Sequence, residues 1–170
     1  MDYVLPDVLA PGLRVVFCGS AAGRRSAAEG AYYAGVGNRF WPMLYRTGLT
    51  PLMLQPQQYR EVLVHGIGLT DLAKENSGAD CEIADAAYDS SRLRHVIEEL
   101  APAALAFNGK RAAQLFCGGG VSYGIQRDLC GTTKVFVLPS TSGAARRFWV
   151  EEPWWQLAEW LKSQWPVQEN

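Results

Sequence analysis

Polar side chains and glycines follow the apolar runs of this sequence, and these are the positions where chemistry could take place. The first run ends at Gly19 and Ser20, a second ends at Asp71, and a third ends at Asn108. A carboxylate such as Asp71 can accept a proton from water, and it can also stabilise a developing positive charge. These turns are therefore the first candidates for a hydrolytic or binding site.

Other kinds of site find less support. Ser140 and Ser142 follow the last apolar run, but neither His65 nor His95 is placed to activate a serine, which argues against covalent catalysis. The sequence also lacks a P-loop and a G-x-G-x-x-G motif, so a nucleotide-binding hydrolase is only a third hypothesis.

The elements that must position these residues alternate between strands and helices. Apolar runs without alternation are typical of strands buried on both faces of a parallel sheet. They predict strands at 14–18, 66–71, 103–107 and 134–138, and helices at 38–48, 57–64, 90–100 and 110–117 and from Pro153 onward. The fold class is thus α/β, a three-layer domain with a mainly parallel sheet of about four or five strands. In such sheets ligands bind at the carboxyl ends of the strands.

Composition favours one domain with a sizeable core. The chain has 170 residues, of which 48% are hydrophobic, so we expect a single domain over 1–170 with its core at about 9–162. The net charge of -1 gives no global reason to bind a polyanion. Three basic pairs nevertheless follow predicted strands and could hold phosphates there: Arg24-Arg25, Lys110-Arg111 and Arg146-Arg147.

The cysteine pattern indicates the compartment. None of the four cysteines forms a C-x-x-C motif and no signal peptide precedes them, so we expect reduced thiols in a cytoplasmic protein and no metal site. No apolar run approaches membrane-spanning length.

Several of these turns together resemble a known family. From about Leu9 to Trp160, the chain resembles mismatch-specific uracil-DNA glycosylases and thymine-DNA glycosylases. The motifs that carry the resemblance are GSAAG, the Tyr32-Tyr33 pair ahead of NRFW, and the GLTD, FNGK and LPSTSGAAR turns. The resemblance implies a monofunctional enzyme without cofactor that flips uracil out of DNA and hydrolyses its glycosidic bond. It also implies action on thymine or other deaminated bases opposite G in double-stranded DNA. Single-stranded DNA is a further expected substrate, and we expect a monomer because nothing in the sequence demands a partner subunit.

The resemblance also assigns roles to residues. The positions that contact the flipped base in the family are matched here by Gly19, Ser20, Ala21, Tyr33 and Asn108, with Tyr33 stacking on the base and main-chain N–H groups near Ser20 and Tyr33 binding its carbonyl oxygens. The expected DNA contacts are Arg24, Arg25, Lys110, Ser140, Ser142, Gly143, Ala144, Arg146 and Arg147.

Two positions depart from the family pattern. Ala21 stands where the family usually has an asparagine that positions the attacking water, so Asp71 becomes the candidate catalytic residue; its alternative role is to cap a helix beginning at Leu72. Ala144 stands where a leucine usually enters the DNA stack, which leaves Arg146 or Arg147 to fill the gap or to bind phosphates.

Three alternatives stay open. Asn108 is either a turn residue or a base-reading amide, with the turn favoured, and Tyr33 is either a stacking platform or part of the core. The loss of the asparagine at position 21 also allows a lesion-binding protein without catalysis on the same fold.

Overall fold

A five-stranded sheet forms the centre of the protein in the computed structural model, which describes residues 2–165. The strands are β1 (Val15–Gly19), β2 (Ile67–Asp71), β3 (Ala104–Asn108), β4 (Gly124–Cys130) and β5 (Thr133–Leu138), in the order β2-β1-β3-β5-β4. Only β4 is antiparallel to its neighbour. The predicted α/β class with a mainly parallel sheet is confirmed.

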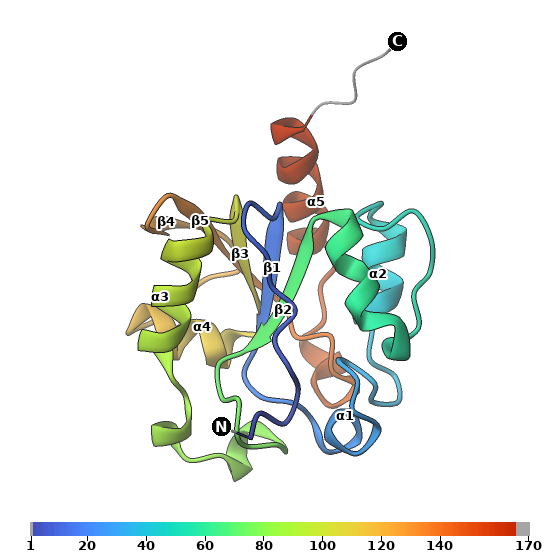
Figure 1. The fold of residues 1–170 in the computed structure, drawn as a ribbon, viewed down its shortest axis with the longest axis vertical. Helices are drawn as coiled ribbons and strands as arrows, with labels where there is room; N and C mark the ends of the chain where they lie inside the picture. The colour runs from blue at the N-terminus through green and yellow to red at the C-terminus, as the bar shows by residue number, and fades with distance from the viewer. Residues whose placement is uncertain (1, 166–170) are drawn as a thin grey trace.

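Helices cover both faces of this sheet (Figure 1). They are α1 (Arg24–Glu29), α2 (Phe40–Arg46), α3 (Ser90–Leu100), α4 (Lys110–Cys117) and α5 (Glu152–Gln164), with 3₁₀ segments η1 (Pro56–His65), η2 (Asp80–Glu82), η3 (Asp85–Ala87) and η4 (Gly143–Phe148). One layer contains α3 and α4, and the other contains α2, η1 and α5. Within residues 2–165, none of the helices is both long and apolar enough to cross a membrane.

The central strands divide their side chains between two cores. In β1, Val15 and Phe17 pack with α2 and α5, whereas Val16 and Cys18 pack with α3 and α4. The Phe17 ring lies between Phe40 and Trp154, with centroids 5.2 and 5.4 Å away. Because every residue of β1, β2 and β3 is buried, these strands lack the polar alternation of a half-exposed sheet.

Several expected elements differ from those observed. The sequence prediction missed β4 and the short helix α1 inside the first loop. Helix α3 is capped by Asp89, whose carboxylate accepts the Arg92 main-chain N–H at 2.9 Å. No helix begins at Leu72 in the described structure, so the alternative role of Asp71 as a cap is wrong as well.

A buried ion cluster attaches the N-terminal segment to the sheet. The Asp7 carboxylate forms ion pairs with Lys74, at 3.0 Å, and with Arg92, and it accepts a hydrogen bond from Thr70 Oγ1 at 2.7 Å. The Lys74 side chain is only 3% exposed, and its Nζ also donates to the Tyr32 hydroxyl at 3.1 Å. This cluster connects the N-terminus, β2 and α3.

Removing the Asp7 charge tests how much this cluster stabilises the fold. Asp7→Asn keeps the shape but leaves the buried Lys74 and the partly buried Arg92 without their carboxylate, and we expect it to lower the free energy of unfolding by about 3 kcal/mol. Urea denaturation measures this loss. Asp128→Asn, at an exposed position on β4, is the matched control and should change stability by no more than about 0.5 kcal/mol. A loss as small as the control's would show that the cluster contributes nothing to stability.

Candidate active site

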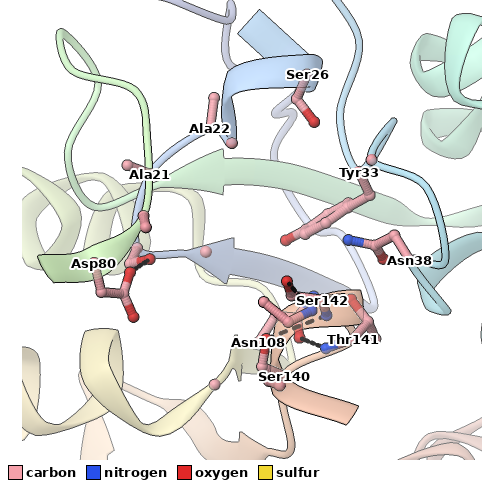
Figure 2. Close-up of a pocket in the computed structure, with 18 of the residues that line it drawn as sticks. Ala21, Ala22, Ser26, Tyr33, Asn38, Asp80, Asn108, Ser140, Thr141 and Ser142 are labelled. Carbon is pink, nitrogen blue, oxygen red and sulfur yellow. Dashed lines mark hydrogen bonds between the residues drawn. The ribbon is translucent and has the colours of Figure 1, made fainter. Parts of the chain in front are cut away.

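A pocket of about 660 Å³ opens at the carboxyl ends of β1, β2, β3 and β5, where the sequence placed the site (Figure 2). Its wall is built from four loops that are far apart in the sequence. Residues that line it include Gly19 to Ser26, Tyr32, Tyr33, Asn38, Asp71, Asp80, Asn108 to Ala112, Ser140 to Ser142, Ala144, Ala145 and Phe148.

The structure brings together most of the residues predicted from the sequence. All five expected base-binding residues and Asp71 line the pocket, as do Arg24, Arg25, Lys110, Ser140, Ser142 and Ala144. Gly143, Arg146 and Arg147 do not line it, but they belong to η4, whose other residues form part of its rim.

Asp71 lies at the inner end of the pocket, where β1 and β2 approach closely. It pairs in register with Gly19 and is 4% exposed. A Cβ atom at position 19 would lie 2.6 Å from Asp71 Oδ1, so only glycine leaves room for this carboxylate. Burial raises the pKa of Asp71 to about 6; the Lys74 and Arg92 charges oppose this shift and the Asp7 charge adds to it.

Tyr33 presents an aromatic ring to the pocket (Figure 2). One face of the ring stacks on Phe40, with centroids 3.9 Å apart. The hydroxyl is buried without a hydrogen-bond partner among residues 2–165, and burial together with the nearby Asp71 charge raises the pKa of Tyr33 well above its ordinary value. Its backbone φ of 55° lies in the left-handed region, which is unusual for a large side chain.

Main-chain donors lie next to this ring. The N–H groups of Ser20 and Tyr33 have no hydrogen-bond partner within the described part of the chain, and both residues line the pocket. The Ser20 hydroxyl is not available in the same way, because it donates to Asp80 Oδ1 at 2.5 Å. The main chain, rather than the Ser20 side chain, is thus able to bind a carbonyl oxygen here.

Asn108 joins two loops of the pocket. Its Oδ1 accepts the Thr141 main-chain N–H at 3.0 Å, and its Nδ2 donates to Thr141 Oγ1 at 2.8 Å. The side chain therefore fixes the end of β3 to the loop after β5, and one Nδ2 hydrogen is left for a ligand.

The sequence analysis missed one pocket residue, Asn38. Its Oδ1 accepts the Phe40 main-chain N–H at 3.0 Å, in a turn just before α2, whose N-cap residue is Arg39. This turn uses only the oxygen, however, and Figure 2 shows the amide nitrogen pointing into the pocket near the Tyr33 hydroxyl. The sequence indicated the start of a helix at Asn38 but did not reveal that its amide nitrogen faces the pocket.

The arginines around the pocket fall into two groups. On the side of α1 and α4, Arg24, Arg25 and Arg111 pair with Glu82, Glu29 and Asp85. On the side of η4, Arg39, Arg146 and Arg147 have no carboxylate within 4.0 Å among residues 2–165. We call these three residues the η4 arginines. Their charges are free to meet phosphates, whereas those of the first group are partly neutralised.

The chemical groups in the pocket are carboxylate, amide, hydroxyl and main-chain N–H. Residues 2–165 contain no cluster of three or more His, Cys, Asp or Glu side chains that could hold a metal ion. A buried carboxylate beside a ring and fixed hydrogen-bond donors can bind a planar heterocycle and polarise a water molecule.

The fold agrees with the comparison to known proteins. The family model of the uracil DNA glycosylase superfamily matches residues 6–162, and the chain belongs to this superfamily. It is also similar to the solution NMR structure of a proposed uracil DNA glycosylase from Methanosarcina acetivorans. The two share 25% sequence identity with a TM-score of 0.65, over 93% of this chain and 96% of that one.

The pKa of Asp71 makes a prediction about stability. Since the folded-state pKa, about 6, lies above the ordinary value of 3.8, the folded protein holds this proton more tightly than the unfolded chain, and stability falls as pH rises from about 4 to 6. Asp71→Asn removes the buried charge, so at pH 8 we expect it to raise the free energy of unfolding by about 2–3 kcal/mol.

Urea denaturation of both proteins between pH 4 and pH 8 measures this difference. The advantage of Asp71→Asn should shrink as pH falls, because the wild-type carboxyl is then protonated in the folded state. A difference that does not change with pH would contradict the raised pKa.

Proposed function

We propose that the protein is a monofunctional DNA glycosylase that removes uracil from DNA, acting as a cytoplasmic monomer. The observation that carries this proposal is the grouping of the Tyr33 ring, unpaired main-chain N–H groups and the buried Asp71 carboxylate in one pocket. Membership of the uracil DNA glycosylase superfamily supports it independently.

The pocket suits a flipped pyrimidine. The base would lie against the Tyr33 ring, whose opposite face is already supported by Phe40. The N–H groups of Ser20 and Tyr33 would bind its carbonyl oxygens, and these bonds strengthen as the base leaves with negative charge. The donors thus stabilise the leaving group more than the bound substrate.

Hydrolysis then needs a water molecule at the sugar. The bond between C1′ and the base nitrogen breaks with both electrons going to the base, leaving a sugar with oxocarbenium character. Water adds to C1′ and gives a proton to the Asp71 carboxylate, which also stabilises the cationic sugar. The products are the free base, which takes a proton from solvent, and an abasic sugar.

Asn38 is the second candidate for handling the water. Its Nδ2 points into the pocket (Figure 2), and its Oδ1 retains a lone pair beside the bond from Phe40. It carries no charge, so it would position water without accepting a proton. Asp71 can therefore both position a water molecule and accept its proton, whereas Asn38 can only position it.

The substrate preference follows from the cost of base flipping. Flipping costs a few kcal/mol and least at a mismatch, so we propose that uracil or thymine opposite G is preferred over uracil opposite A. This is also the preference implied by the resemblance to mismatch-specific glycosylases.

Single-turnover assays separate the roles of Asp71 and Asn38. On a duplex with uracil opposite G, we expect Asp71→Ala to reduce the rate at least 100-fold, since general base catalysis contributes about 10²–10⁴-fold. DNA affinity should stay within twofold of wild type. Asn38→Ala is the matched comparison, and a loss restricted to Asn38→Ala would assign the water to the amide.

The same assay tests the alternative of a lesion-binding protein, which the alanine at position 21 favours. Wild-type protein is compared on uracil opposite G, uracil opposite A, thymine opposite G and single-stranded uracil, with alkali used to reveal abasic sites. Tight binding without abasic product on all four substrates would overturn the proposal of an enzyme.

The pKa of Asp71 also predicts the pH dependence of the rate. Only the ionised carboxylate can act as a base, so below about pH 6 the single-turnover rate should fall roughly tenfold per pH unit, and above it the rate should level off. The rate of Asp71→Asn should not show this fall below pH 6. A wild-type rate that does not change between pH 5 and 8 would remove Asp71 as the base.

A further inference from the structure

An exposed phenylalanine stands at the rim of the pocket. Phe148 is 60% exposed, whereas the other five phenylalanines are buried. A 3₁₀ helix has three residues per turn, so Ala145 and Phe148 share a face of η4, and both line the pocket together with Ala144. The two alanines offer only methyl groups to the rim, whereas Phe148 offers an exposed ring.

The backbone that carries this ring is held firmly. The Ser142 hydroxyl accepts the Ala144 main-chain N–H at 3.3 Å, and the Asn108 side chain fixes the neighbouring Thr141. Gly143 packs so closely on the loop before Asn38 that a Cβ there would lie 3.0 Å from the Val36 carbonyl oxygen. The ring is therefore presented from a fixed turn.

The charges around this ring suit DNA. The Arg147 guanidinium carbon lies 4.8 Å from the Phe148 ring centroid, and Arg146 is two residues away. Arg39 lies on the same side, because its main-chain N–H donates to the Thr141 carbonyl at 2.9 Å. An aromatic ring among the η4 arginines combines a stacking surface with cations that have no carboxylate partner within the described residues.

We propose that Phe148 enters the DNA stack, fills the space that the flipped nucleotide leaves, and stacks on the base opposite it. This inference rests on the proposed function, because it assumes a flipped nucleotide in the pocket. A methyl group at Ala144 cannot fill such a gap, whereas an aromatic ring can stack on any base. The η4 arginines then bind the phosphates on either side.

A binding experiment that needs no turnover tests the role of Phe148. The probe is a duplex with a stable tetrahydrofuran abasic site, compared with the same duplex intact, and affinities are measured by fluorescence anisotropy. We expect Phe148→Ala to lose at least tenfold of the preference for the abasic duplex, with less than twofold change on intact DNA. Phe148→Trp should retain the preference.

Two further variants serve as comparisons. Arg147→Ala should weaken binding to both duplexes alike and reduce the slope of log affinity against log salt by about 1, as expected for a phosphate contact. Tyr45→Ala removes an aromatic residue of similar exposure, 48%, that does not line the pocket, and it should bind like wild type.

Activity assays then separate this inference from the proposed function. Phe148→Ala should excise uracil at least tenfold more slowly from duplex but within threefold of wild type from single strands. If wild type releases no uracil and yet the abasic preference depends on Phe148, the enzyme proposal fails and the role of Phe148 stands. An unchanged preference in Phe148→Ala, or no preference in wild type, would overturn the role of Phe148.

Discussion

The pocket depends on the close approach of β1 and β2 at their carboxyl ends. In the parallel register Gly19 lies beside Asp71, and the missing side chain of the glycine makes the space that the carboxylate occupies. The first loop can then leave β1 directly above this carboxylate and bring Ser20 and Tyr33 to the same pocket. A single contact between backbone and side chain thus sets the inner end of the pocket, and the surrounding loops build on it.

A second constraint is the charge buried behind Asp71. Two carboxylates, Asp7 and Asp71, and two cations, Lys74 and Arg92, lie close enough to influence one another's ionisation. Asp7 engages both cations directly, and Asp71 is left buried without an ion-pair partner within 4.0 Å among residues 2–165. Its carboxylate therefore stays reactive toward the pocket instead of being neutralised by a salt bridge.

The elements that could be predicted from the sequence are those whose pattern comes from burial. The central strands are continuous apolar runs, so four of the five strands and their polar ends were found. The strand β4 was missed because it lies at the edge of the sheet, where only Gly124 and Cys130 at its two ends are buried and its apolar residues form no continuous run. Among the residues that line the pocket, Asp71 and Tyr33 were expected from strand ends and family motifs. The position of the Asn38 amide and the pairing of the arginines could not be predicted from the sequence. They depend on side-chain directions and on contacts between distant segments.

Thr141 connects segments around the pocket that are far apart in the sequence. Its side chain and main-chain N–H are both bound by Asn108 at the end of β3, and its carbonyl accepts the Arg39 main-chain N–H before α2. One small residue thus connects the end of β3, the segment before α2 and the start of η4. A larger or apolar residue at position 141 would therefore disturb the Asn108 side chain and the position of Arg39 at once, although neither residue is its neighbour in the sequence.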